Sequence, residues 1–175
     1  LLDAARAWAG RTPPPLVAIV GDGPLEGELR ARIDAEDLPV RLLGRRADVA
    51  GLLAASDVAV VPSVWEGQPL VVQEILRAGR PLVATRVGGI PGMVGADERP
   101  PGDGLLHGPE SEAALLVPPG DADALERAVS RVLDDPALAA RLASAAAHRS
   151  ALLPGEDDAV DQLAALYLDL AGPRH

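Results

Sequence analysis

Cysteine, lysine and phenylalanine are all absent from this chain of 175 residues. Without cysteine the chain has no disulfide and no thiolate metal site. All 16 basic residues are arginine, and the 26 acidic residues bring the formal net charge to −10. This balance argues against a general nucleic-acid-binding surface. It still permits binding of one phosphorylated small molecule, which needs only a local positive field.

Long apolar runs are also missing. No stretch approaches the roughly 18 apolar residues that a membrane-spanning helix needs, and the first residues lack a signal-peptide pattern. We therefore expect a soluble protein that is cytoplasmic or peripheral. Only 2% of the residues are aromatic although 48% are hydrophobic, so the core must be aliphatic. An aliphatic core is typical of parallel strands that helices cover on both faces.

Strand-like and helix-like segments alternate along the chain. Short aliphatic runs between Pro, Gly and polar residues predict strands at 15–21, 39–44, 57–63, 81–89 and 113–118. Helical spacing predicts helices at 1–10, 24–36, 47–56, 69–79, 121–134, 136–149 and 157–171. This alternation predicts an α/β fold with an open, doubly wound parallel sheet. Segment 95–112, rich in Gly, Pro and acids, is expected to be a solvated loop without chemistry.

Sheets of this kind bind ligands beyond the carboxyl ends of their strands. The loops at those ends here are "GDGP" (21–24), "GRR" (44–46), "PSVWEGQP" (62–69) and "TRVGGIPG" (85–92). We therefore expect the functional residues to lie in these four loops.

Two carboxylates, Glu66 and Glu74, stand eight positions apart across the start of the helix expected at 69–79. Pro69 suits the first turn of that helix. Its apolar face is predicted to consist of Val71, Val72, Ile75 and Leu76. The simplest interpretation of Glu74 is then a surface carboxylate near Arg77. The alternative is a nucleotide-sugar site, because a carboxylate accepts bonds from adjacent hydroxyls and a helix N-terminus binds phosphate.

Four segments together resemble the carboxyl-terminal, donor-binding half of GT-B glycosyltransferases, and specifically the large retaining family 4, or group 1. They are "VAIVGDGP", "RLLGRRADVAGLLAASDVAVVPS", "EGQPLVVQEILRAGRPLVATRVGGIP" and "LLVPPGDADALERAVSRVLDDP". The resemblance runs from residue 1 to about residue 150. It implies a Rossmann-like donor-binding domain at 1–150, followed by a C-terminal helix and tail at 151–175.

The resemblance also implies roles for single residues. Glu66 matches the first acid of a Glu-x7-Glu motif, which makes it the catalytic residue that contacts the transferred sugar, and Glu74 would bind the ribose diol. The backbone of Gln68, Pro69 and Leu70 would face hexose and phosphate. Gly21 and Gly23 would line the cleft, and Arg45 and Arg46 would border the nucleobase. Gly88 and Gly89 would let the next loop lie close by, because they carry no side chain. Ordinary turn chemistry is an equal alternative for each glycine.

In such enzymes the departing diphosphate is stabilised electrostatically, so the resemblance implies no cofactor and no obligate metal. The implied function is retaining glycosyl transfer from a nucleotide-diphosphate sugar. The implied partners are that donor and an amino-terminal acceptor-binding domain, which is absent here, and the absent half would allow peripheral membrane association. Alternatives are a non-catalytic sugar-nucleotide-binding module and a sugar-nucleotide epimerase of the same architecture.

The chain departs from the family pattern at its start. Its first strand, with the Arg and Lys that hold the diphosphate, is missing, and Gly92 stands where members often have Glu. We therefore interpret the chain as a fragment. The missing strand would lie between the strands at 16–20 and 58–62, so these either pair directly or leave a gap. Unpaired backbone at such a gap predicts marginal stability.

Other motifs favour simpler interpretations. "GDGPLEG" resembles a dinucleotide fingerprint, but the next strand does not end in the required acid. Asp121 and Asp123 resemble a metal-binding pair, although Asp121 is better placed to cap a helix. No role is assigned to His107, His148 or His175. Trp65 either stacks on a sugar ring or fills a gap under its loop.

Overall fold

A computed structural model of the protein describes residues 1–96, 113–153 and 155–171. The strands are β1 (Val17–Val20), β2 (Val40–Gly44), β3 (Ala59–Val61), β4 (Leu82–Thr85) and β5 (Ala114–Val117). The helices are α1 (Leu2–Trp8), α2 (Glu26–Glu36), α3 (Val49–Ala55), α4 (Leu70–Arg77), α5 (Ile90–Met93), α6 (Ala122–Asp134), α7 (Pro136–Ser150) and α8 (Glu156–Ala171).

Each expected strand and helix is present, so the predicted α/β class is confirmed. The structure also contains one helix, α5, that the sequence did not predict. Its four residues, Ile-Pro-Gly-Met, are too few to show helical spacing, and Pro and Gly are typical of turns. The loop expected at 95–112 lies, apart from its first two residues, outside the described part of the chain, as do His107 and His175.

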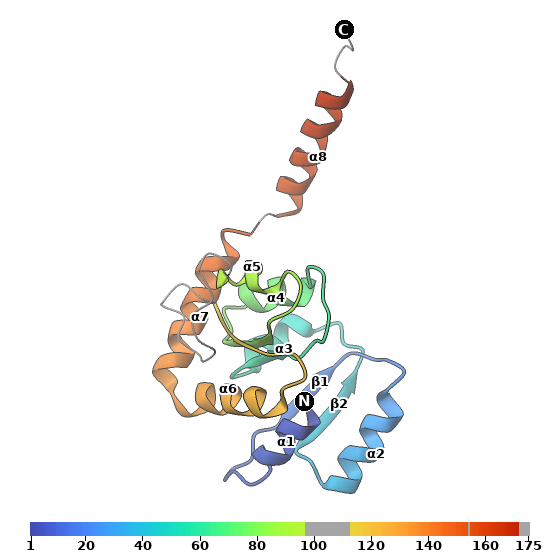
Figure 1. Ribbon diagram of the computed structural model, residues 1–175, viewed down its shortest axis with the longest axis vertical. Helices are drawn as coiled ribbons and strands as arrows, with labels where there is room; N and C mark the ends of the chain where they lie inside the picture. The colour runs from blue at the N-terminus through green and yellow to red at the C-terminus, as the bar shows by residue number, and fades with distance from the viewer. Residues whose placement is uncertain (97–112, 154, 172–175) are drawn as a thin grey trace.

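The strands form two parallel sheets. β1 pairs with β2, and β3, β4 and β5 pair in that order with β4 in the centre. Figure 1 shows the β1–β2 pair set apart from the other three strands. No ladder joins β1 to β3 among the described residues, so the gap is observed and not direct pairing of these two strands. The marginal stability expected from such a gap stays a prediction.

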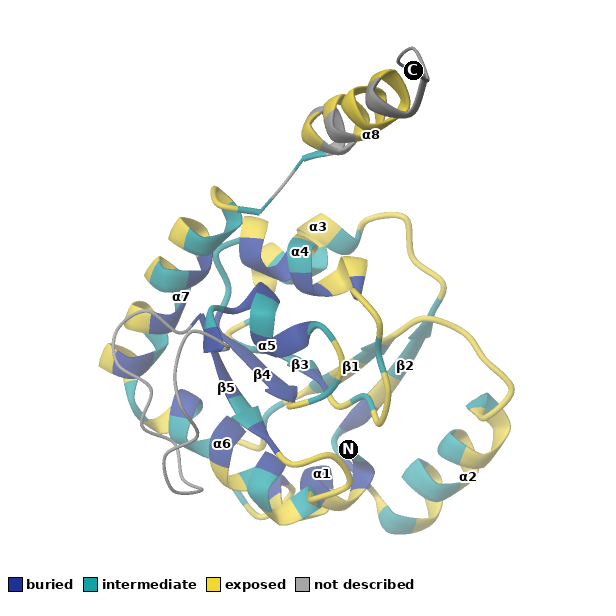
Figure 2. Ribbon diagram, turned by 45° about the horizontal axis from the view of Figure 1, so that its top comes forward, coloured by how far each residue is buried: buried dark blue, intermediate teal, exposed yellow. Residues whose placement is uncertain are grey.

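Helices cover both faces of the β3–β4–β5 sheet, as in a doubly wound fold. Side chains of β4 alternate between two hydrophobic clusters: Val83 packs with Leu125 and Val129 of α6, whereas Leu82 and Ala84 pack with α4 and α5. All four residues of β4 are buried, and Figure 2 shows this strand in the colour of buried residues. The continuous aliphatic strand expected for a parallel sheet is therefore confirmed here.

The β1–β2 sheet differs, because β1 is buried on one face only. Val17 and Ile19 pack against the hydrophobic core, whereas Ala18 and Val20 are exposed. Leu29 and Ile33 of α2 belong to the same cluster as Val17 and Ile19, which leaves the opposite side of β1 exposed. The expectation that helices cover both faces of the strands is therefore wrong for β1.

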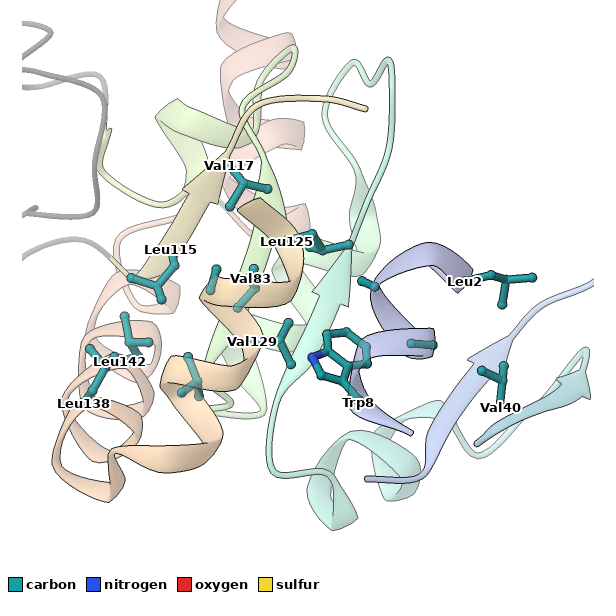
Figure 3. Packing of buried hydrophobic residues seen from close by; sticks show 14 of the residues in the cluster. Leu2, Trp8, Val40, Val83, Leu115, Val117, Leu125, Val129, Leu138 and Leu142 are labelled. Carbon is teal, nitrogen blue, oxygen red and sulfur yellow. The ribbon is translucent and has the colours of Figure 1, made fainter. Parts of the chain in front are cut away.

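The two sheets share a hydrophobic core through α1 and α6. Trp8 at the end of α1 is 2% exposed and belongs to one cluster with Val40 of β2, Val83 of β4 and Val129 of α6. Figure 3 shows the indole of Trp8 next to Val129, with Val40 beyond it on the other sheet. Burying a large aromatic side chain contributes strongly to a core. Helix α1 therefore helps to hold the separated β1–β2 pair against the rest of the fold.

Helix α8 extends away from the body of the protein (Figure 1). Its large apolar side chains Val160, Leu163, Leu166, Tyr167 and Leu168 are exposed. The predicted domain boundary at residue 150 falls at the last residue of α7 and stays a prediction. Across the described residues, none of the helices combines the length and the apolar character that crossing a bilayer requires.

Candidate functional site

Glu66 lies in the loop between β3 and α4, and two hydroxyl groups fix this loop. Ser63 Oγ donates a hydrogen bond to Glu66 Oε1 at 2.7 Å. The backbone oxygen of Ser63 in turn accepts from Thr85 Oγ1 at 2.5 Å. Thr85 ends the neighbouring strand β4 and is only 3% exposed. The half-buried Glu66 carboxylate is therefore tied through Ser63 to the centre of the sheet.

Gly88 and Gly89 bring the loop after β4 against the same segment. Gly88 has a φ of +52°, and a β-carbon on it would lie 1.7 Å from the backbone oxygen of Glu66. The Gly89 amide donates to the Gly67 oxygen at 2.7 Å, and Gln68 borders Gly89. Only glycine allows backbone to approach this closely. For this pair the geometry therefore favours close approach between loops over simple turn formation.

Helix α4 begins at Leu70, directly after this loop. Pro69 is the residue before the helix, with φ −70° and ψ 119°, and does not lie in the first turn as predicted. No side chain caps this helix start. The Val72 amide donates to the Pro69 oxygen at 3.0 Å, whereas among the described residues the Leu70 and Val71 amides have no hydrogen bond. Together with the helix dipole, free amides make a helix N-terminus suitable for an anion.

The surface of α4 differs in one position from the prediction. Val72, Ile75 and Leu76 are buried as expected, but Val71 is 39% exposed. Leu70 is 72% exposed beside it. The buried stripe of α4 is too narrow to hold all four predicted side chains, and Val71 lies at its edge. Glu74 is exposed on the second turn, and no hydrogen bond or ion pair among the described residues joins it to Glu66 or to Arg77.

A second group of predicted residues lies at the carboxyl ends of β1 and β2. The Gly21 amide donates to the Gly44 oxygen at 2.8 Å, which brings Gly21 next to the turn that carries Arg45 and Arg46. Gly21 and Gly23 are exposed, and a β-carbon at either residue would meet no atom within 4 Å. This group therefore forms an open turn region, distinct from the close contact at Gly88.

Arg46 is engaged by a neighbour. Its Nε and Nη2 donate to the two carboxylate oxygens of Asp48 at 2.8 and 2.7 Å. This pair lowers the pKa of Asp48 and raises that of Arg46, in each case mainly through the side-chain hydrogen bond. Arg45 is exposed and has no hydrogen bond or ion pair within the described residues. Of the two arginines, Arg45 is thus the one whose charge is not already offset.

The structure therefore assembles the predicted residues in two groups. Close contacts join the loop of Glu66 and Gln68 with Gly88 and Gly89, and α4 continues that loop to Glu74. The other group contains Gly21, Gly23, Arg45 and Arg46. No hydrogen bond between the two groups is found among the described residues. A ligand that uses both would have to extend from one group to the other.

The rival motifs are resolved in part. Asp121 accepts a hydrogen bond from the Ala124 amide at 2.8 Å and so caps α6, as the simpler interpretation predicted. In the parts of the chain that the structure describes, no three His, Asp or Glu side chains are grouped to hold a metal ion. Trp65 is 80% exposed, so its interpretation as a gap-filling side chain is wrong. His148 is exposed near the end of α7.

Sequence reasoning missed Ser63 and Thr85. Both are small polar residues directly at the carboxyl end of an aliphatic run, the place where ligand loops begin. Their position at the carboxyl ends of strands was the only feature of the sequence that could have indicated a role in the site. Hydroxyl residues are so common at strand ends that only the observed hydrogen bonds single out these two.

Comparisons with known proteins identify relatives of this chain. The MMP α-(1→4)-mannosyltransferase of Mycolicibacterium hassiacum is 33% identical over 120 residues, which are 69% of this chain and 26% of that protein. Sucrose-phosphate synthase of Thermosynechococcus elongatus superimposes with a TM-score of 0.77 at 28% identity, over 97% of this chain and 42% of that one. Anabaena HepE in complex with UDP-glucose gives a TM-score of 0.71 at 26% identity, over 87% and 39%.

The chain thus spans between about a quarter and two fifths of the length of these proteins. The profile of the family described as Glycosyl transferases group 1 matches residues 1–135. This match covers most of the chain and contains every residue of both groups described above. The chain therefore belongs to the group 1 glycosyl transferases and has the Rossmann-like architecture of one half of a GT-B fold.

Proposed function

We propose that this chain is the donor-binding half of a glycosyltransferase and binds a nucleotide-diphosphate sugar for retaining transfer to an acceptor held by a separate amino-terminal domain. The observation that supports it most is the loop of Glu66, which the hydrogen bonds of Ser63 and Thr85 hold beside the uncapped start of α4 (the braced loop). In this proposal Glu66 contacts hydroxyls of the transferred sugar and Glu74 binds the ribose diol. The structures of HepE with UDP and UDP-glucose support this class of ligand.

The positive end of α4 carries the phosphate in this proposal. Its first amides are not used by a side-chain cap, and Gly88 and Gly89 leave the neighbouring backbone without side chains. Backbone amides and a helix dipole stabilise phosphate charge where it develops on the leaving group. The proposal therefore includes no obligate metal and no cofactor besides the donor. Its proposed compartment is the cytoplasm.

The chain alone is expected to bind the donor without turning it over. A nucleotide sugar is a long ligand whose base, ribose, diphosphate and hexose each need a partner. In this proposal the two groups of residues at the ends of the two sheets supply such partners. The acceptor has no proposed contact on this chain, so transfer needs the other domain. Product analysis with that domain present separates a transferase from an epimerase.

Isothermal titration calorimetry tests the proposal. UDP-glucose and GDP-mannose are titrated into the chain, with uridine and guanosine as ligands that lack phosphate. We expect one of the nucleotide sugars to bind and neither nucleoside to bind detectably. The N-terminus of α4 contributes to affinity by contacting the diphosphate, which the nucleosides lack. Failure of both nucleotide sugars would contradict the proposed function.

Substitution of Glu74 tests the ribose contact. Glu74→Ala removes a carboxylate that would accept two hydroxyl bonds, and hydrogen bonds to charged groups contribute about 1.5–3 kcal/mol. Affinity should fall about tenfold or more, for the nucleotide sugar and for the nucleoside diphosphate alike. Glu28→Ala is the matched control, since Glu28 is also an exposed helical glutamate, on α2. An unchanged affinity in Glu74→Ala would exclude the ribose role.

A further inference from the structure

Ser63 has no role among the residues predicted from the sequence, yet it is hydrogen-bonded to Glu66. Ser63 follows β3, and its hydroxyl donates to Glu66 Oε1 at 2.7 Å while its backbone oxygen accepts from the buried Thr85. Thr85 Oγ1 also lies 3.4 Å from the Val61 oxygen. The backbone of Ser63 is therefore held by Thr85 of β4, and the side chain of Ser63 in turn holds the Glu66 carboxylate.

Glu66 is held at its backbone as well. Its carbonyl group lies against Gly88, and the next carbonyl, that of Gly67, accepts from Gly89 at 2.7 Å. With the backbone held, the position of the carboxylate depends on the side-chain torsions. A free glutamate side chain has many rotamers, and the bond from Ser63 selects among them. The Glu66 carboxylate is thus preorganised before any ligand arrives.

The same bond leaves acceptor capacity on Glu66. An ionised carboxylate has two oxygens with about four acceptor positions. Ser63 occupies one position on Oε1, and within the described part of the chain no donor is bonded to Oε2. A sugar hydroxyl is a donor that suits such an oxygen, and a charge-assisted bond of this kind is stronger than a neutral one.

We propose that Ser63 is a positioning residue that orients the Glu66 carboxylate and leaves its second oxygen for a hydroxyl of the donor sugar. This inference rests on the proposed function of Glu66. Preorganisation improves binding because less rotamer freedom is lost when the ligand binds. Ser63 acts through Glu66, so its effect should appear only with ligands that carry the sugar.

The test compares ligands with and without the sugar. UDP-glucose and UDP, and GDP-mannose and GDP, are titrated by calorimetry into the chain and into Ser63→Ala. We expect the affinity for the nucleotide sugar to fall about threefold to tenfold in Ser63→Ala, the range that loss of one net hydrogen bond gives. The affinity for the nucleoside diphosphate should stay unchanged, because that ligand does not reach Glu66.

Further variants separate positioning from folding. Ser63→Thr keeps the hydroxyl and should restore the preference for the sugar-bearing ligand. In a Glu66→Ala background, Ser63→Ala should have no further effect. Ser56→Ala is the matched control, since Ser56 is also half-buried and its hydroxyl bonds to the Leu53 oxygen at 2.8 Å, away from Glu66. Should Ser63→Ala fail to fold, Ser63→Cys keeps most of the volume with a weaker donor and should give an intermediate affinity.

Four results would overturn the inference. Equal losses for the nucleotide sugar and the nucleoside diphosphate would show a merely structural serine, and unchanged affinities for both ligands would show no role at all. A native chain that binds both ligands equally would show that Glu66 does not contact the sugar, while the nucleotide part of the proposed function would stand. A native chain that binds neither ligand would reject the proposed function itself.

Discussion

The carbonyl oxygen of Glu66 occupies the place that a β-carbon on residue 88 would need, at 1.7 Å from it. Gly88→Ala must therefore push apart the two loops that carry the candidate site. Overpacking and the positive φ each cost about 1–3 kcal/mol, so the free energy of unfolding should fall by about 2–6 kcal/mol. Urea denaturation followed by circular dichroism measures this loss.

Gly51→Ala is the control for Gly88→Ala. Gly51 lies inside α3, is exposed, and has open space where a β-carbon would be. Alanine is favoured over glycine in a helix by about 0.5–1 kcal/mol, so this variant should be slightly more stable. Equal stabilities of the two variants would show that the close contact at Gly88 is absent in solution.

Ion pairs that join α1 to α2 predict an acid-sensitive fold. Arg32 hydrogen-bonds to Asp3 and to Glu36, which lowers the pKa of Asp3 from 3.8 and that of Glu36 from 4.5. A carboxyl whose folded pKa is lowered stabilises the fold above its ordinary pKa, and this stabilisation is lost as the pH falls through the folded pKa. The melting temperature should therefore decrease as the pH falls below about 4.5.

Arg32→Gln should flatten this pH dependence in part, because it removes the hydrogen-bond partner of Asp3 and one of the two arginine partners of Glu36, which keeps Arg6. Arg30→Gln should leave it unchanged, since Arg30 pairs with Glu26 within α2 and joins no other element. These groups are exposed or only half-buried, so the difference should be small and should shrink further in high salt. Parallel curves for the native chain and Arg32→Gln would contradict the assignment.

The cap at Asp121 distinguishes a structural role from a metal site. Asp121→Ala removes the acceptor for the Ala124 amide, and loss of such a cap costs about 0.5–2 kcal/mol. Thermal denaturation should show this loss, whereas the affinity for nucleotide sugars should not change. Asp123→Ala, without a capping bond, should cost less. A melting temperature of the native chain that rises with added Mg²⁺ or Mn²⁺, but not in Asp121→Ala, would favour the metal interpretation.

Helix α8 should be dispensable for the stability of the body. A chain that ends at Leu153 loses five large apolar side chains that are exposed in the structure, so its unfolding midpoint should stay the same. Its tendency to self-associate, measured by light scattering, should decrease because exposed apolar surface promotes association. A chain that ends at Asp135 also loses Leu138, Leu142 and Ala146, which are buried, and should unfold. A lower midpoint for the chain ending at Leu153 would show that α8 packs on the body.

Periodicity and turn residues were enough to predict the alternating strands and helices. β4 is the clearest case, since a strand buried on both faces needs an unbroken aliphatic run. The partial exposure of β1 could not be predicted in the same way. Its run "VAIV" is as apolar as that of β4, and which face is covered depends on where α1 and α2 pack. Tertiary packing decides burial where local sequence does not.

The candidate site was predictable to the level of its loops. The glycine pair at 88 and 89 could be expected to form either a turn or a close contact, and only the distance to Glu66 decides between them. The bond from Ser63 to Glu66 is local in sequence, but its support by Thr85 crosses 22 residues and depends on β3 and β4 being neighbours. Such contacts follow from strand order, which the loop sequences do not contain.

Amide chemical shifts of the chain, recorded by NMR during titration with UDP-glucose or GDP-mannose, test the central claim most directly. If the braced loop and the start of α4 bind the donor, the largest changes should fall on residues 66–74 and on Gly88 and Gly89. Changes confined to the turn around Asp121, or the absence of any change at saturating ligand, would contradict the account.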